Sequence, residues 1–247
     1  MAKKKKKKLK LRIDRVIIAA VAVIVVLFGV YKGISFVVSQ VMALFNGISE
    51  NVAPVVEHQY DGVVVLDPGH GGMDAGAKRG KLYEKNIALT TVQAIGKRLE
   101  KENIRVIYSR TSDTPLHEDK ATDLRMRAEL SAKYKANYFV SIHVNDFDKS
   151  NDVTGYEIYT KDEVSRALAT SISQSIDQLK YSKFRGLQDG KTLAVLRQNT
   201  VPSVLVEIGY IKGKDYNYLN DNQKLEKLGD KIAEGILSQI HKKDKQL

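Results

Sequence analysis

Cysteine is absent from the 247 residues, and only 4 prolines and 5 histidines occur. The chain can therefore form no disulfide, no thiolate metal site and no cysteine nucleophile, and any metal must be held by histidine and carboxylate side chains. The first 60 residues contain 10 Lys+Arg against 3 Asp+Glu, whereas the rest of the chain contains 30 against 26. The formal charge of +11 is thus mainly an N-terminal feature, and nucleic acid is not an expected partner.

Only one stretch of the sequence is long and apolar enough to cross a membrane, from Val16 to about Val38. Nine basic residues precede it, and no Lys or Arg lies between Gly33 and Tyr60. The positive-inside rule then predicts a single-pass protein of the cytoplasmic membrane, with its N-terminus inside and the rest exported. We expect a basic segment at 1–15, an anchor at 16–38, a stalk at 39–60 and one main domain at 61–247.

A cleaved signal peptide would have the same basic start and apolar centre, and Val41–Ala43 offers a weak small-residue exit. We favour a retained anchor, and the alternative stays open.

Strand-like and helix-like segments alternate through residues 61–247. We expect helices at 87–101, 123–134, 164–179 and 225–240, and strands at 63–66, 104–109, 138–142, 155–160, 192–196 and 203–208. Such βαβ alternation predicts an α/β fold with a mostly parallel sheet flanked by helices. Sites in such folds lie where the strands end.

Two of the five histidines follow buried strands, His70 after "VVVL" and His143 after "YFVSI". Their positions favour a shared ligand, and glycines on both sides of His70 would let a bulky substrate approach. We expect the other three histidines, His58, His117 and His241, to be solvated.

Zinc chemistry without cysteine needs two histidines, a carboxylate and an open position for water. Glu84 precedes a predicted helix, so it has an alternative role as a carboxylate that complements the helix dipole. Glu207 lies in the apolar segment "SVLVEIGY", where a buried carboxylate is costly unless it is paired or functional.

Four motifs in register, "VVLDPGHGG", "EK" at 84–85, "SIHVN" and "VEIGY", resemble the zinc-dependent N-acetylmuramoyl-L-alanine amidases of bacteria over residues 62–241. The resemblance implies a mixed sheet of about six strands, one Zn²⁺, and hydrolysis of the amide between the lactyl group of N-acetylmuramic acid and L-alanine in peptidoglycan. It also implies that His70, Glu84 and His143 hold the metal and that Glu207 is the catalytic acid/base. We expect a monomer.

The chain departs from the family pattern at Val144 and Asp146, which are expected to alter the rim of the site. Asp67 could orient an imidazole or cap its turn, and Asn145 could orient an imidazole or a substrate amide. Arg125 and Arg127 could meet an anionic peptide, but a solvated or salt-bridged helix face is the favoured interpretation.

Two other functions stay open at this point. A zinc peptidase could use the same residues to cut within the stem peptide, and a wall-binding module could retain the fold without catalysis. The second would have no need for Glu207. The short segment between 109 and 123 leaves no room for an occluding helix, which predicts an open site.

Overall fold

The computed structural model describes residues 13–51 and 58–244, and the chain divides into two units at His58 and Gln59. The first unit contains the helix α1 (Ile13–Asn51), in which 20–44 form a candidate membrane span with a mean hydropathy of 2.4. A signal sequence would meet the same criteria. The helix continues through the first part of the predicted stalk, whereas the basic residues before Ile13 lie outside the described residues.

The second unit alternates strands and helices in the following order: β1 (Gly62–Pro68), β2 (Lys78–Arg79), β3 (Leu82–Tyr83), α2 (Glu84–Glu100), β4 (Ile104–Tyr108), α3 (Lys120–Lys133), β5 (Tyr138–Asn145), β6 (Tyr156–Thr160), α4 (Glu163–Asp177), β7 (Phe184–Asp189), α5 (Ala194–Arg197), β8 (Ser203–Tyr210), α6 (Tyr216–Leu219) and α7 (Asn222–Asp244). All four predicted long helices are present, with ends shifted by a few residues.

The main sheet has six strands in the order β4-β1-β5-β8-β6-β7. Strands β4, β1, β5 and β8 are parallel, and β6 and β7 run antiparallel to them. This arrangement confirms the predicted α/β fold with a mixed, mostly parallel sheet. It also brings the carboxyl ends of β1, β5 and β8 to one edge of the sheet, where the candidate site residues lie.

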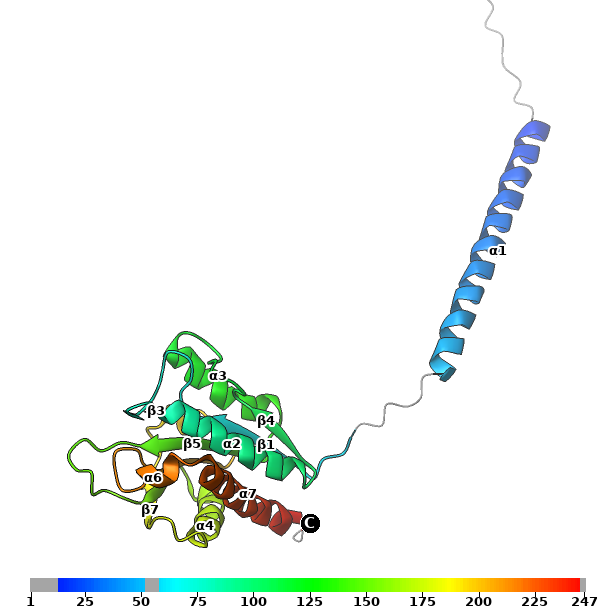
Figure 1. Cartoon of the computed structure of the whole chain (residues 1–247). Helices are drawn as coiled ribbons and strands as arrows, with labels where there is room; N and C mark the ends of the chain where they lie inside the picture. The colour runs from blue at the N-terminus through cyan, green and yellow to red at the C-terminus, as the bar shows by residue number, and fades with distance from the viewer. Residues whose placement is uncertain (1–12, 52–57, 245–247) are drawn as a thin grey trace, which may run out of the picture. The chain divides into compact units, whose positions relative to one another are not determined.

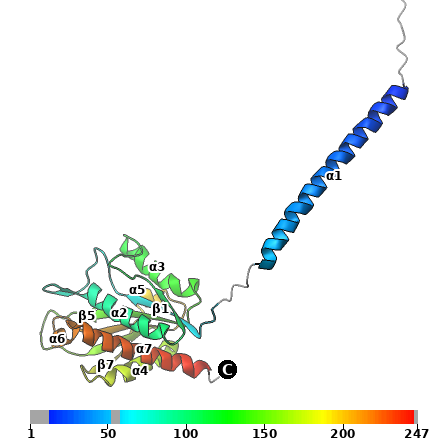
Figure 2. The same cartoon turned by 45° about the vertical axis from the view of Figure 1, so that its right-hand side comes forward.

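Helices cover the two faces of this sheet unequally. On one face α2 and α4 pack on the strands and α7 lies beside both of them, as Figures 1 and 2 show, and this side contains the larger hydrophobic cluster. On the other face α3 packs on β1 and the short α5 packs on β8. A smaller cluster around Phe139, Val195 and Leu205 fills this side.

One predicted strand is wrong. The segment "TLAVL" at 192–196 leads into the helix α5, in which Val195 and Leu196 are buried. A short apolar run satisfies a strand or a helix equally well, and here it covers the sheet instead of joining it. The sixth strand is β7, "FRGLQD", whose polar composition concealed it because it lies at the edge of the sheet.

Candidate active site

His70 lies in a tight turn directly after β1. Its φ is +60°, and the following Gly71 and Gly72 have φ of +134° and +59°, conformations that L side chains adopt at a cost. Gly69 and Gly76 have a different role, because the absence of a side chain lets other site residues pack closely against them. A Cβ on Gly69 would lie 2.4 Å from the His143 ring, and one on Gly76 would lie 2.4 Å from Glu84 Oε2. These glycines therefore bring the site residues together, a reason beyond substrate access.

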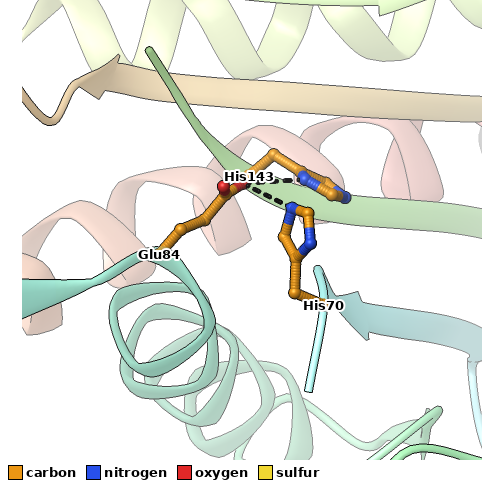
Figure 3. Close-up of side chains that lie close together, drawn as sticks. All are labelled: His70, Glu84 and His143. Carbon is orange, nitrogen blue, oxygen red and sulfur yellow. Dashed lines mark hydrogen bonds and ion pairs between the residues drawn. The ribbon is translucent and has the colours of Figure 1, made fainter. Parts of the chain in front are cut away.

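Glu84 is the first residue of α2 and reaches both histidines (Figure 3). Its Oε1 lies 2.9 Å from His143 Nδ1 and 3.1 Å from His70 Nε2. The backbone N–H of Val144 donates to Oε1 and that of Ala77 to Oε2. Burial acts to raise the pKa of Glu84, but its hydrogen bonds and charge interactions with His143 and His70 outweigh burial and hold the pKa well below its ordinary value. Glu84 is thus a fixed, charged carboxylate between the two histidines.

The structure brings the three predicted metal-ligand residues, His70, Glu84 and His143, into one cluster in which all three candidate ligand atoms lie within 4.8 Å of one another. Their separations of 2.9 and 3.1 Å are close to the roughly 3.3 Å edge of a tetrahedron with bonds of about 2.0–2.1 Å, the Zn–N and Zn–O lengths. Two imidazoles and one carboxylate are a donor set that zinc accepts. The cluster therefore fits a metal.

Asp74 supports His70 from outside the cluster. Its Oδ1 lies 2.9 Å from His70 Nδ1, and its Oδ2 lies 2.8 Å from Lys120 Nζ. The contact with His70 is an ion pair and not an aligned hydrogen bond. A carboxylate at the second nitrogen of a histidine favours the tautomer with the proton on that nitrogen. The sequence interpretation did not include Asp74, although a carboxylate four residues after a candidate ligand is a recognisable signal.

Two buried guanidinium groups hold the turn that carries His70. Arg127 donates to the carbonyls of Pro68 and His70, at 2.9 and 2.7 Å, and Arg110 donates to those of Pro68 and Gly69, at 3.1 and 2.7 Å. Asp67 and Asp123 together neutralise Arg127, at 3.1 and 2.6 Å. Arg110 follows β4 as His70 follows β1, so the strand-end pattern could have identified it.

Asp67 is fully buried at the end of β1. It accepts hydrogen bonds from Ser109 and Ser141, at 2.5 and 2.8 Å, in addition to its pair with Arg127. Burial acts to raise the pKa of Asp67, but Arg127 and the two hydroxyls outweigh it and lower the pKa below 3.8. Asp67 thus acts on the turn through Arg127.

Glu207 lies on β8 directly beside His143 of β5 in the strand register. Its Oε2 is inaccessible to solvent, and no described residue donates a hydrogen bond to it. Burial and the charges of Glu84 and Glu157 raise the pKa of Glu207 well above its ordinary value. A cation between these carboxylates would relieve the repulsion, which again fits a metal at the cluster.

A cleft of about 430 Å³ adjoins the two histidines on the side of α3 and α5. It is lined by His70 and His143, by the turn 71–74, and by apolar side chains that include Leu124, Val195 and Leu205. The segment between β4 and α3, all of it described, contains no helix. The cluster is therefore open to a ligand, as the length of that segment predicts.

Other residues from the sequence interpretation lie elsewhere. The Val144 side chain is in the core and not on the rim, and Asp146 pairs with Lys212 at 2.7 Å. Arg125 is exposed and pairs with Glu129. Asn145 donates to Glu157 at 3.4 Å. The favoured interpretation, a solvated or salt-bridged helix face, describes Arg125. It does not describe Arg127, which is buried, holds the His70 turn and lines the cleft.

The remaining histidines, His58, His117 and His241, are exposed, as expected. His117 nevertheless lines the cleft beyond the turn that carries His70.

The sequence matches the family model described as N-acetylmuramoyl-L-alanine amidase over residues 64–238, and the chain belongs to this family. It is 33% identical over 177 residues to "Probable cell wall amidase LytH" of Staphylococcus aureus, a match that covers 70% of this chain. The chain spans 56% of the length of that curated relative.

Solved structures are similar in fold. The N-acetylmuramoyl-L-alanine amidase AmiC2 of Nostoc punctiforme has a TM-score of 0.68 and 34% identity, over 73% of this chain and 98% of that one. The N-acetylmuramoyl-L-alanine amidase of Clostridium difficile 630 also has a TM-score of 0.68, with 29% identity, over 76% and 100% of the two chains.

Proposed function

We propose that this chain is a zinc-dependent N-acetylmuramoyl-L-alanine amidase. It hydrolyses the amide between the lactyl group of N-acetylmuramic acid and L-alanine of the stem peptide in peptidoglycan. Family membership and the similarity to solved amidases support the substrate class. The cluster of two histidines and two carboxylates at the strand ends supports hydrolysis of an amide.

His70, Glu84 and His143 hold the zinc in this proposal. A zinc ion bound there would polarise the scissile carbonyl and lower the pKa of a water molecule toward neutrality. The chain itself holds two of these residues: Glu84 is held by two backbone N–H groups, and the turn of His70 by Arg110 and Arg127.

Glu207 is the general base and then the general acid. Its raised pKa suits a group that takes a proton from the attacking water and gives it to the amine of L-alanine as the amide breaks. The observation that carries the proposal is its unpartnered oxygen beside His143. A module that only binds the wall would have no use for a costly buried carboxylate at that point.

Product analysis tests this function. Purified full-length chain in detergent should release intact stem peptides with a free L-alanine N-terminus from peptidoglycan and leave free lactyl carboxyl groups on the glycan. A chelator should abolish the release, and added zinc should restore it. Cleavage inside the stem peptide would show a peptidase instead, and binding without any product would show a wall-binding module.

We also propose that α1 is a retained single-pass anchor, with the N-terminus in the cytoplasm and the catalytic unit on the wall side. The apolar window at 20–44 and the basic residues before it support this topology. External protease on cells stripped of their wall should remove the catalytic unit and leave a small membrane fragment. A soluble, N-terminally trimmed protein from untreated cells would show a cleaved signal.

The site residues come from a single chain, which supports action as a monomer. The open cleft supports activity without an activating partner. Zinc-loaded, folded protein that digests peptidoglycan only after a cell extract is added would contradict this part of the proposal.

A further inference from the structure

A row of polar side chains continues from the metal cluster across the sheet. Glu207 of β8 lies opposite His143 of β5 on one side and opposite Glu157 of β6 on the other. Residues directly opposite on adjacent strands point to the same face of a sheet. Glu157 therefore lies on the catalytic face, two strands away from His143.

Glu157 is buried and densely bonded. Its Oε1 accepts from Arg185 Nε at 2.7 Å and from the Tyr210 hydroxyl at 2.9 Å. Its Oε2 accepts from the Tyr159 hydroxyl at 3.1 Å and from the Asn145 amide at 3.4 Å. The two hydroxyl donors and the amide donor already give each oxygen a hydrogen bond. The ion pair with Arg185 is therefore an additional contact, through which Glu157 holds a charged partner.

Arg185 of β7 is that partner, and it is only partly used. Its side-chain stem lies over Gly155, where an added Cβ would come within 2.4 Å of it, and its Cζ lies 5.4 Å from the centre of the Tyr210 ring. Nη1 approaches the Thr154 carbonyl at 3.4 Å. The hydrogen bonds to Glu157 and Thr154 engage Nε and Nη1 and not Nη2, and the Tyr210 hydroxyl also interacts with the guanidinium. The side chain is 35% exposed. A fixed guanidinium thus keeps donors free for an anion.

The position of Arg185 suits one part of the substrate. Strands lie about 4.8 Å apart, so Glu157 and the guanidinium that it holds lie roughly 10 Å from the strand of His143. An extended peptide advances about 3.3–3.6 Å per residue, so two or three residues cover this distance. The cleft beside the cluster extends over β1, β5 and Leu205 of β8, and neither Glu157 nor Arg185 lines it.

We propose that Arg185, held by Glu157, binds a carboxylate of the stem peptide two or three residues beyond the scissile amide and thereby determines substrate specificity. The inference rests on the proposed amidase function. The peptide carries free carboxylates, whereas the glycan next to the bond offers hydroxyl and acetamido groups and its lactyl carboxyl is tied up in the amide. Peptides whose carboxylates are converted to carboxamides are therefore poor ligands.

The test uses zinc-loaded full-length chain in detergent with Glu207→Gln to prevent turnover. Its ligands are soluble muramyl peptides that differ only in a free carboxylate or a carboxamide at the second or third residue. Calorimetry should show about 10- to 100-fold tighter binding of one carboxylate form, the range for a hydrogen bond to a charged group. Adding Arg185→Met should bring this ratio to within about threefold, and Arg185→Lys should keep part of it.

Controls separate this role from folding. Arg166 pairs with Glu163 on α4, a helix on the other face of the sheet, so Arg166→Met should leave the ratio unchanged. Arg185→Met alone could lower zinc content or melting temperature by leaving Glu157 unpaired. In that case the double variant Arg185→Met/Glu157→Gln, which removes both charges together, is used in its place. Equal affinity for both peptide forms, binding of neither, or a ratio that Arg185→Met leaves intact would overturn the inference.

Failure of the proposed function gives a different result. A chain with Glu207 intact that binds the carboxylate peptide through Arg185 but releases no stem peptide from peptidoglycan would refute the amidase function alone. With turnover, the same pair of substrates should differ in kcat/KM by a similar factor, mainly through KM, because Arg185 lies away from the reacting bond.

Discussion

The two faces of the neighbouring strands β5 and β8 differ in composition although they share the same backbone. On the face covered by α2 and α4 the side chains are all apolar and buried, such as Ile142 and Val206. On the face that α3 and α5 partly cover, His143 and Glu207 are half-buried and polar residues surround them. Successive side chains of a strand point to opposite faces of the sheet. One face of β5 and β8 therefore mainly stabilises the fold, and the other carries the candidate catalytic residues.

The exception to this division is Asp67, which lies on the catalytic face and yet is fully buried and bonded. The buried polar groups on this face form a hydrogen-bond network that fixes the turn carrying His70. Substitutions on the two faces should therefore have different effects on activity and on stability.

Replacing His70 with Ala should remove a metal ligand and bring amidase activity to background. The cluster then retains only two of its three donors, which should not hold zinc stoichiometrically. Metal analysis of the purified variant checks this expectation. His241→Ala, a change at an exposed histidine near the C-terminus, is the matched control. Stoichiometric zinc in the His70→Ala protein would mean that the ligand assignment is wrong.

Glu207→Gln should lower kcat by about 10²–10⁴-fold with little change in KM, because a positioned general base acts mainly in the transition state. Zinc content and melting temperature should be retained, since the change removes a buried carboxylate whose Oε2 has no partner among the described residues. Turnover within roughly threefold of the unchanged chain would remove Glu207 from the mechanism and point to another acid as the base.

Asp67→Asn should destabilise the catalytic unit by about 2–5 kcal/mol at neutral pH, because it breaks a buried ion pair with Arg127, which then keeps only Asp123 as a counter-charge, and weakens the bonds from Ser109 and Ser141. The pKa of Asp67 is lowered on folding, so its contribution is present above about pH 4 and is lost as the pH falls through the folded value. Denaturant unfolding between pH 2 and 7 should therefore show a smaller difference at the acid end. An equal difference at every pH would exclude a contribution from the Asp67 charge.

Ile142→Ala opens a cavity on the apolar face, next to a site residue in sequence but opposite to it in the sheet. It should cost about 2–5 kcal/mol of stability, the usual range for a fully buried isoleucine. Zinc affinity and kcat of the folded protein should stay within about threefold. A large loss of zinc affinity would show that the two faces of β5 are not separable.

Asp74→Asn should weaken zinc binding by about 10- to 100-fold, the usual effect of losing a carboxylate behind a histidine ligand. Burial acts to raise the pKa of Asp74, but Lys120 and His70 outweigh it and lower the pKa to about 2. The carboxylate is then charged throughout the range above pH 4, so the loss should be nearly independent of pH there. Competition with a fluorescent chelator measures it, and Asp152→Asn, at an exposed carboxylate that pairs with Lys214, is the control.

Prediction from the sequence worked well where one residue pattern had one structural solution. The long amphipathic segments all became helices, and five of the six expected strands are present. It failed where composition and position disagreed. The apolar segment at 192–196 covers the sheet as part of α5, whereas the polar segment at 184–189 joins it as β7. An edge strand needs fewer apolar residues, because it is buried less.

The amino-acid composition limits the possible chemistry: without cysteine, the site must use histidines and carboxylates, and strand-end positions with the "VEIGY" segment identified His70, His143 and Glu207. The distant groups that support these residues became visible only in the folded chain. Arg127 meets the His70 turn from 57 residues away, and Arg185 meets Glu157 from 28. Such contacts depend on strand order and register, which short-range patterns do not specify because the pairing partners are separated by whole helices.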